Sequence, residues 1–301
     1  MVAERVARGN VAQRDLRMLM PIPSEYDRNL NAHYGRTGLS AFLLASLREN
    51  GKDVDHLHAD DLSPVDHFHS RGRESTLELA SLANVGRGTR ILDVGGGIGG
   101  AARLLAANFG ARVTVLDIAE EFCMAGEDLT ARTGLTDHVN FRCGSALDLP
   151  FPAGSFDIVW TQHCTMNVPD KRRLYGEAHR VLVPGGRLAM HEIIAGPVQP
   201  IHFPVPWAPD ASISFLPNED ELRECLGESR FRLLSWSDVT EASLVWFRER
   251  VGRPEAEDSR LGLHLLLRDA FRPAFENQVV NLEELRLIVV MALLESAQTT
   301  C

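Results

Sequence analysis

The sequence predicts an α/β fold, in which helices cover both faces of a mostly parallel sheet. From about residue 90 to residue 240, short apolar runs alternate with longer helical patterns. A glycine-rich turn joins the first of the expected strands to its helix. Of the 301 residues, 45% are apolar, which is enough for a sizeable core. We therefore expect one large domain with additions.

The first strand and the turn after it organise the rest of the chain. Arg90–Val94 is a short apolar run, and the glycine-rich stretch from Gly95 to Gly100 follows directly. Glycine adopts backbone angles that other residues avoid, and it lets a ligand approach the main chain closely. The helix expected over Ile98–Phe109 points the positive end of its dipole at that ligand. The pattern predicts a site for an anionic group.

The spacing of the glycines fits two kinds of nucleotide site. Gly95, Gly97 and Gly99 form one pattern, and replacing the third by Gly100 gives the dinucleotide fingerprint. Both kinds of site place an acid at the end of the next strand, to accept hydrogen bonds from ribose hydroxyls. Asp117 occupies that position. The glycines alone therefore leave both kinds of site open.

Strand and helix patterns continue in alternation after this turn. Further strands are expected at Arg112–Asp117, Val139–Cys143, Phe156–His163, Arg187–Ile194 and Phe231–Val239. Helices are expected at Ala119–Thr133, Lys171–Leu182 and Asn218–Gly227, with further helical segments between Glu241 and Phe271. Asn218 is the expected N-cap of its helix. Pro184–Gly186 predicts a turn before the fifth strand.

Asp93 separates the two kinds of nucleotide site, because a dinucleotide-binding protein usually has a small or apolar residue beside the glycine turn. Five motifs together resemble those of class I S-adenosylmethionine-dependent methyltransferases. They are Asp93–Gly99, Asp117, Gly144–Phe151, Phe156–Trp160 and Leu182–Arg187. The resemblance covers about residues 67 to 240. It is nearest to the small-molecule group that contains the sarcosine/dimethylglycine and ubiquinone/menaquinone methyltransferases.

The resemblance implies a Rossmann-like sheet of seven strands in the order 3-2-1-4-5-7-6, with the last strand antiparallel. The apolar segment Leu285–Leu294 reads as a helix or a strand, and Ile288, Val289 and Val290 favour the closing strand that the family has. The resemblance also implies an N-terminal helical cap over residues 1–80. A cofactor-binding domain then covers residues 81–301, with a lid inserted at about residues 195–217.

The resemblance implies S-adenosylmethionine as cofactor and S-adenosylhomocysteine as its product. The residues implied to bind it are Asp93, Gly95, Gly97, Gly99, Asp117, Ile118, Ser145, Ala146 and Gln162. The three glycines hold the methionine part and Asp117 holds the ribose, while Ser145 and Ala146 meet the adenine. Many members carry an acid in place of Ser145, and a serine hydroxyl accepts from the exocyclic amine more weakly than a carboxylate does.

Methyl transfer from a sulfonium requires alignment of acceptor and methyl group, exclusion of water and, for some acceptors, a base. His163 and Asn167 follow the fourth expected strand, and His191 and Glu192 lie near the end of the fifth. All four are candidates to orient or deprotonate the acceptor, because open α/β sheets bind ligands at their carboxyl edge. Each could instead face the core or pair with a neighbour.

Two loops could cover the acceptor. We expect the run His67-Phe68-His69 to close over the cofactor, with a polar loop or a metal site completed by His163 or His191 as the alternatives. We predict no metal. Residues 195–217 are rich in proline and aromatic residues, which suit a lid over an apolar or cationic acceptor or a loop packed on the body.

Composition narrows the range of partners. A formal net charge of -10 argues against nucleic acid. Five cysteines without C-x-x-C spacing indicate neither a disulfide framework nor a zinc site and fit a reducing cytoplasm. No apolar run has the length of a membrane span, and residues 16–20 suit an amphipathic helix better than a transit peptide. The candidate partners are a small-molecule acceptor and, in a homodimer, a second copy of the chain.

Two other functions stay open. An NAD(P)-dependent oxidoreductase could use the same glycine turn. A non-catalytic module could bind S-adenosylmethionine and a protein partner. Asp93 and the combined motifs argue against the first, and the several candidate bases argue against the second.

Overall fold

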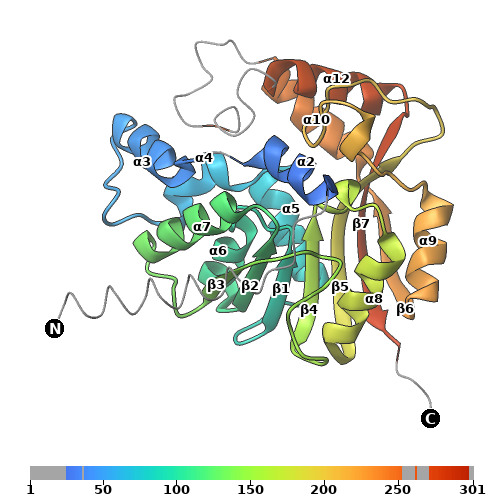
Figure 1. Ribbon diagram of the computed structural model, residues 1–301, viewed down its shortest axis with the longest axis horizontal. Coiled ribbons are helices and arrows are strands. Elements are labelled where there is room, and N and C mark those ends of the chain that lie inside the picture. Colours follow the sequence, from blue (N-terminus) through green and yellow to red (C-terminus); the bar gives the residue numbers. More distant parts are fainter. Residues whose placement is uncertain (1–24, 36, 253–261, 263–270, 298–301) are drawn as a thin grey trace.

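The computed structural model describes residues 25–35, 37–252, 262 and 271–297, and within them a single seven-stranded sheet forms the centre of the molecule (Figure 1). Its order is β3-β2-β1-β4-β5-β7-β6, which confirms the predicted topology. The strands are β1 (Arg90–Val94), β2 (Arg112–Asp117), β3 (Val139–Cys143), β4 (Phe156–Gln162), β5 (Leu182–Ala195), β6 (Phe231–Asp238) and β7 (Leu287–Ser296). β7 is antiparallel to β5 and β6, and the other pairs are parallel.

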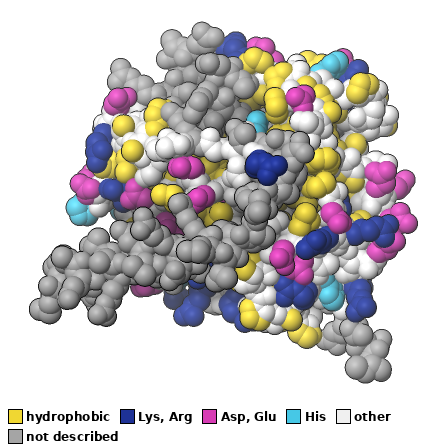
Figure 2. All heavy atoms as spheres, viewed as in Figure 1, with side chains coloured by type: hydrophobic (Ala, Val, Ile, Leu, Met, Phe, Trp, Pro, Cys, Tyr) yellow, Lys and Arg dark blue, Asp and Glu magenta, His cyan; other side chains and the backbone are white. Residues whose placement is uncertain are grey.

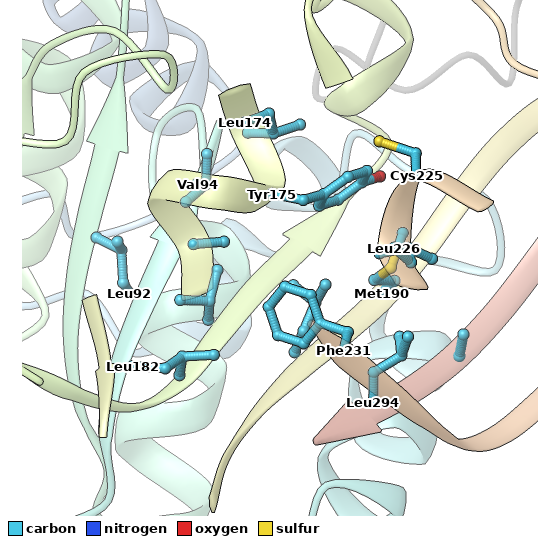
Figure 3. Close-up of a cluster of buried hydrophobic side chains, with 14 of the residues drawn as sticks. Leu92, Val94, Leu174, Tyr175, Leu182, Met190, Cys225, Leu226, Phe231 and Leu294 are labelled. Carbon is cyan, nitrogen blue, oxygen red and sulfur yellow. The ribbon is translucent and has the colours of Figure 1, made fainter. Parts of the chain in front are cut away.

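Successive residues of the central strands enter two different hydrophobic clusters, because side chains alternate across a sheet. Ile91 and Ile158 face α5 (Gly72–Leu82) and α6 (Gly100–Phe109), and α7 (Glu120–Arg132) packs beside them. Leu92 and Val159 face α8 (Lys171–Val181) and α9 (Glu219–Glu228). Figure 3 shows this second cluster, in which side chains of strands, α8 and α9 meet. Helices therefore cover both faces, as predicted.

Among the strand boundaries that differ from the prediction, the start of β5 and the end of β4 have a clear physical cause. β5 begins at Leu182 rather than Arg187, and the expected turn at Pro184–Gly186 lies inside it. The pairing with β4 shifts register there, between Phe156 and Ile158, so the proline and glycines form an irregularity within the strand. β4 ends at Gln162, because the next residue has a left-handed φ of 49°.

The N-terminal helices lie over the carboxyl end of the sheet (Figure 1). They are α2 (Glu25–Tyr34), α3 (Leu39–Glu49), the short 3-10 helix η1 (Ala59–Leu62) and α4 (Ser63–Asp66). Leu43 and Leu47 of α3 share a buried cluster with Leu129 of α7. α5 crosses the predicted boundary at residue 80, and Leu79 packs in the sheet core. The amphipathic helix expected at residues 16–20 lies outside the described residues.

A buried ion pair fastens these N-terminal helices to the domain. Arg103 of α6 is fully buried and donates to both carboxylate oxygens of Asp66, at 3.1 Å from Nε, and to Thr130 at 3.0 Å. At Gly100 a Cβ atom would lie 1.8 Å from the Asp66 carbonyl oxygen. Gly100 therefore serves the approach of the cap, whereas the dinucleotide fingerprint would reserve it for helix packing.

Two C-terminal helices, α10 (Thr240–Val251) and α12 (Phe271–Glu283), connect β6 to β7 and pack against each other. Helical segments were expected between Glu241 and Phe271, and α10 confirms the first part, but residues 253–261 and 263–270 lie outside the described ranges. α12 was not expected. Its Phe275 shares a cluster with Phe247 and with Trp207 of the 195–217 loop.

Charged side chains of both signs are interspersed over α8 and α9 on the right of Figure 2. Arg172 pairs with Glu228 across these helices, and Arg223 pairs with Glu219 within α9. On this face the positive charges do not gather into a patch. Every helix within the described ranges is too short or too polar to cross a lipid bilayer.

Candidate functional site

The glycine-rich turn after β1 borders a cavity of about 140 Å³, which we call the main cavity. Gly95 and Gly97 have φ values of +69° and +57°, in the left-handed region that favours glycine. At Gly95 a Cβ atom would lie 2.4 Å from Cys164 Cβ, so no larger residue fits. Around Gly97 the nearest atom to a Cβ is 3.8 Å away, on Phe122. The turn is therefore closely packed against Cys164 on one side and open on the side of the main cavity.

The main cavity lies at the carboxyl ends of β1, β2 and β4, where the parallel sheet predicts a ligand. Ten of the predicted site residues line it: Asp93, Gly95, Gly97, Asp117, Ile118, Ser145, Ala146, Gln162, His163 and Asn167. Gly99, His191 and Glu192 are not among its lining residues. Gly99 is the N-cap of α6, and its backbone packs against the Phe141 ring.

Two carboxylates face this cavity from neighbouring strands. Asp93 is 1% exposed, and its Oδ2 has no hydrogen-bond partner within the described residues. Burial and the nearby Asp117 raise the pKa of Asp93 to about 7. Asp117 accepts from the backbone N–H groups of Gly97 and Ala119, both at 2.9 Å, while burial raises its pKa. A cationic group of a ligand would offset the free-energy cost of burying the Asp93 carboxylate without a partner.

Gln162 lines the main cavity, and two donors fix the orientation of its amide. Its Oε1 accepts from Trp160 Nε1 at 2.9 Å and from Thr76 Oγ1 at 3.1 Å. Its Nε2 is buried and has no partner within the described residues. Because both neighbours donate, the NH₂ group is left to donate to a ligand oxygen.

The opposite end of the main cavity is formed by the segment after β3. Ser145 and Ala146 line it with Leu116 and Ile118 from β2 and its end. The Ser145 hydroxyl accepts from the Leu147 N–H at 3.2 Å, which closes a local turn. This end offers flat apolar walls with one hydroxyl, which suits a nucleobase.

Three histidines pack together beside the main cavity, with ring centroids 4.7 to 6.2 Å apart. His69 and His163 line the cavity, and His191 lies fully buried behind them. Ser70 Oγ lies 3.3 Å from Nε2 of both His163 and His191, and 3.0 Å from Ser243 Oγ. Burial lowers the pKa of each imidazole, that of His69 to about 3. All three rings are therefore neutral near pH 7.

Asn167 uses its amide to join separate parts of the chain. Its Nδ2 donates to the carbonyls of Trp207 at 3.0 Å and Ile213 at 2.8 Å, and its Oδ1 accepts from Tyr34 Oη at 2.9 Å. The 195–217 loop and α2 are thus tied to the end of β4. An amide with these partners holds the walls of the site in place.

Glu192 lies behind the site rather than at its surface. The carboxylate is fully buried and accepts from the N–H groups of Cys164 and Thr165, both at 3.2 Å. Burial raises its pKa to about 7. Because Cys164 and Thr165 follow His163 directly, Glu192 supports the segment that presents the histidine.

A second, narrower cavity of about 20 Å³ adjoins the first and shares Tyr34, Phe68, His69 and His163 with it. We call it the aromatic chamber. Its remaining lining residues are Met166, Ile193, Pro206, Trp207, Trp246, Phe247 and Phe275. The 195–217 loop supplies Pro206 and Trp207, so this loop packs on the body and also forms a wall. Phe68 and His69 lie over the main cavity, as expected of their loop.

No sequence pattern selected Tyr34, Ser70, Trp246, Phe247 and Phe275 as site residues. They come from four segments that the topology brings together only in three dimensions. The adjacent aromatic pair Trp246-Phe247 on a short helix is the one local signal that could have drawn attention to α10.

The paired histidines of the 67–69 loop are both buried. Their ring centroids are 5.6 Å apart, and burial lowers the pKa of His67 to about 4 and that of His69 to about 3. His69 is held by the hydroxyls of Ser75 at 3.2 Å and Thr76 at 3.3 Å. Across the described part of the chain, no three His, Cys, Asp or Glu side chains are grouped so as to hold a metal ion.

Comparison with known proteins places this geometry in a family. Residues 92–190 match the family described as a methyltransferase domain. The chain is 31% identical over 180 residues to 27-O-demethylrifamycin SV methyltransferase of Amycolatopsis mediterranei, covering 60% of this chain and 62% of that protein. It is 32% identical over 133 residues to a glycine/sarcosine/dimethylglycine N-methyltransferase of Actinopolyspora halophila, covering 44% of this chain and 24% of that protein.

Solved structures share the fold. A geranyl diphosphate C-methyltransferase of Streptomyces coelicolor, in complex with Mg²⁺, geranyl diphosphate and S-adenosyl-L-homocysteine, superposes with a TM-score of 0.64 at 18% identity. The match covers 92% of this chain and all of that one. The chain spans between 24% and 62% of the length of four curated relatives that it matches. Residues 92–190 therefore carry a methyltransferase domain, and the chain around them has the fold of solved methyltransferases.

Proposed function

We propose that the protein transfers a methyl group from S-adenosylmethionine to a small-molecule acceptor by in-line displacement. The observation that carries the proposal is the pair of buried acids, Asp93 and Asp117, on either side of an open glycine turn in one cavity. S-adenosylmethionine combines a cationic amino-acid part with a ribose, and each acid suits one of them. The methyltransferase domain at residues 92–190 supports the same ligand.

The cofactor lies, in this proposal, along the carboxyl ends of the strands. Asp93 meets the ammonium group, because its unpaired Oδ2 is buried and needs a cation or a donor. Gly95 and Gly97 let the methionine part approach the main chain, and Gln162 Nε2 donates to its carboxylate. Gly99 acts indirectly, by starting α6 behind the turn.

The nucleoside part occupies the other end of the main cavity. Asp117 accepts from the ribose hydroxyls with the lone pairs that the Gly97 and Ala119 N–H groups leave free. Ile118 and Ala146 pack on the adenine, and Ser145 lies at its edge. Because Ser145 Oγ already accepts from a backbone N–H, its contribution to adenine binding is small.

The sulfonium supplies a leaving group that is already activated, so the protein chiefly aligns the two reactants and excludes water. Among the four candidates for a role in catalysis, His163 lines both cavities and is the proposed base. Asn167 fixes the walls, while His191 and Glu192 support His163 from behind. The last three are therefore proposed as positioning residues.

Calorimetric titration with S-adenosylmethionine, S-adenosylhomocysteine and NAD tests the proposal. We expect the first two to bind and NAD to bind at least 100-fold more weakly, since Asp93 occupies the place of a small residue beside the turn. Binding of NAD alone would return the glycine turn to a dinucleotide role. Binding of S-adenosylmethionine without methyl transfer to any acceptor would favour a non-catalytic module.

We also propose that the protein is cytoplasmic and forms a homodimer. The location is supported by the cysteines in the described part of the chain, since Cys123, Cys143, Cys164 and Cys225 are all free thiols. The predicted absence of nucleic acid from the partners rests on the net charge of -10.

A further inference from the structure

The aromatic chamber has no Asp, Glu, Lys or Arg among its described lining residues. From this, and resting on the proposed function, we infer that the methyl acceptor is an uncharged, largely apolar molecule. It presents a hydroxyl group, such as that of a phenol, to His163 for O-methylation. The inference thus names the chemistry of the acceptor, which the family leaves open because its members act on different atoms.

The walls of the chamber are closely packed rings. Phe247 contacts Trp246 and Phe275 with ring centroids 4.9 and 5.2 Å apart, and Phe247 and Phe275 are 3% and 2% exposed. Apolar and aromatic groups gain by burial among such rings. The volume of about 20 Å³ holds little more than a hydroxyl group, so the ring of a phenol must displace side chains of the chamber when it binds.

An anionic acceptor finds no partner among the described lining residues. Burying an unpaired carboxylate or phosphate costs several kcal/mol or more, so such a group would take up a proton instead. The ring faces attract a cation, but burying an ammonium group costs a similar amount, and no carboxylate lies among these residues to offset it. Lys171 directs its ammonium group to the carbonyls of Val168 and Phe215, away from the chamber. Arg250 lies with its guanidinium carbon 3.4 Å from the Trp246 ring centroid and already uses one face of that ring.

His163 is the polar residue of the aromatic chamber that we assign to contact the acceptor. Its left-handed φ of 49° turns it out of the line of β4 to the boundary between the two cavities. Its Nε2 contacts Ser70 Oγ at 3.3 Å, and its Nδ1 makes no hydrogen bond with any described residue. A strained backbone angle at this place fits a residue held for function.

The contacts of Ser70 bear on which nitrogen of His163 carries the hydrogen. Ser70 Oγ has three polar neighbours, namely Nε2 of His163, Nε2 of His191 and the hydroxyl of Ser243. A hydroxyl donates only once, so at least one of the two imidazoles must donate to it from Nε2. We assign that hydrogen to His163, which leaves the Nδ1 lone pair for the acceptor.

The reaction step balances with these groups alone. The acceptor oxygen forms a bond to the methyl carbon, while the bond from that carbon to the sulfonium sulfur breaks and its electron pair stays on sulfur. The products are the methyl ether and S-adenosylhomocysteine. The hydroxyl proton passes to His163 Nδ1, and solvent removes it after product release.

Three probes with the same hexylphenyl body and different head groups test the acceptor chemistry: 4-hexylphenol, 4-hexylbenzoate and 4-hexylbenzylamine. Each is titrated at pH 7.5 into protein saturated with S-adenosylhomocysteine. We expect the phenol to bind at least 10-fold more tightly than the anion and the cation. Equal or tighter binding of either charged probe, or no binding of the phenol, would overturn the inference. Failure of S-adenosylhomocysteine itself to bind would instead refute the proposed function.

His163→Gln tests the role of the base with a readout that loss of structure would not give. We expect the variant to keep its affinity for S-adenosylhomocysteine and to lose about 100-fold or more in kcat for the phenol at pH 7. Its kcat should then rise with pH toward the pKa of the phenol, near 10, because the ionised acceptor needs no base. The wild-type kcat should stay level between pH 7 and 9, since His69 and His191 beside it are neutral as well.

The matched control is His56→Gln, because His56 is exposed and pairs only with Asp53 on the surface. It should leave kcat and its pH profile unchanged. A His163→Gln variant with wild-type kcat, or one whose kcat is low and flat with pH, contradicts the assignment of His163 as the base.

Discussion

The main cavity and the aromatic chamber lie side by side and share Tyr34, Phe68, His69 and His163, yet their chemistry is opposite. The main cavity carries buried acids, an open glycine turn and an unpaired amide donor. The aromatic chamber has rings and aliphatic walls without a charged residue among those described. In the proposed function, the main cavity binds S-adenosylmethionine and the aromatic chamber faces the methyl acceptor.

The two regions also differ in how the chain builds them. Most of the main cavity comes from residues 93–168, at the ends of consecutive strands of one sheet. The aromatic chamber gathers residues from Tyr34 to Phe275, contributed by α2, β5, α10, α12 and the segments that follow α4, β4 and β5. The comparison teaches that the main cavity is built mainly by the sheet and the turns that end its strands, whereas the aromatic chamber is built mainly by the segments added around the sheet.

The largest expected effect concerns the ion pair that fastens the N-terminal helices to the domain formed around the sheet. Arg103→Met removes the partner of Asp66, which is 8% exposed and lines the main cavity. Leaving one member of a buried ion pair alone typically costs about 3 to 5 kcal/mol in the free energy of unfolding. Urea denaturation followed by circular dichroism measures it.

The matched control is the exposed pair of Arg90 and Asp157, with side-chain exposures of 47% and 38%. Arg90→Met should cost about 0 to 1 kcal/mol. Similar losses in the two variants would show that the cap is not fastened through Arg103.

A smaller effect is expected for the ribose contact. Asp117→Ala removes the proposed partner of the ribose, a carboxylate that also accepts from the N–H groups of Gly97 and Ala119. Hydrogen bonds to charged groups contribute about 1.5 to 3 kcal/mol, so the variant should bind S-adenosylhomocysteine about 30-fold more weakly, or weaker still. Calorimetry measures the dissociation constant. Asp148→Ala, an exposed acid near the same cavity, is the control and should bind normally. Unchanged affinity in Asp117→Ala would remove the ribose from this position.

The smallest expected effect tests the position of the adenine beside Ser145. Ser145→Asp should strengthen S-adenosylmethionine binding by about 3- to 10-fold, since a carboxylate accepts from the exocyclic amine more strongly than a hydroxyl. Aspartate can keep the turn with the Leu147 N–H that Ser145 now makes. Ser145→Ala is the control and should bind slightly more weakly than the wild type. Weaker binding of the aspartate variant than of the alanine variant would place the adenine elsewhere.

The same division explains what could be predicted from the sequence. The strands Arg90–Val94, Arg112–Asp117 and Val139–Cys143 were predicted to the residue. The first two are short, mostly buried apolar runs, and the third, at the edge of the sheet, alternates apolar and polar residues. The acids and glycines that end those strands follow from them. The start of β5 was wrong, since a proline and two glycines usually end a strand and here lie within an irregular one.

The aromatic chamber was not predictable in the same way. Its rings are far apart in sequence, and a Trp or Phe on a helix is more often part of a core than of a ligand site. Gly100 shows a second limit of sequence patterns. It fits the dinucleotide fingerprint, but its need for glycine comes from the Asp66 carbonyl of the cap, a contact that local sequence does not encode.

The measurement that tests the central claim most directly is the number of protons released when S-adenosylhomocysteine binds at pH 7. Asp93 has a pKa of about 7 in the unliganded protein, so the carboxyl group is about half protonated there. An ammonium group beside it favours the charged form and lowers the pKa. Binding should therefore release about half a proton and weaken as the pH falls below 7.

Titrations in buffers of different ionisation enthalpy give this number. Asp93→Asn should abolish the release, whereas Glu192→Gln should keep it, because Glu192 has a similar pKa but does not line the main cavity. Release of about half a proton that disappears only with Asp93 is the predicted result. No release in the wild type, or the same release in Asp93→Asn, would contradict the placement of the cofactor beside Asp93.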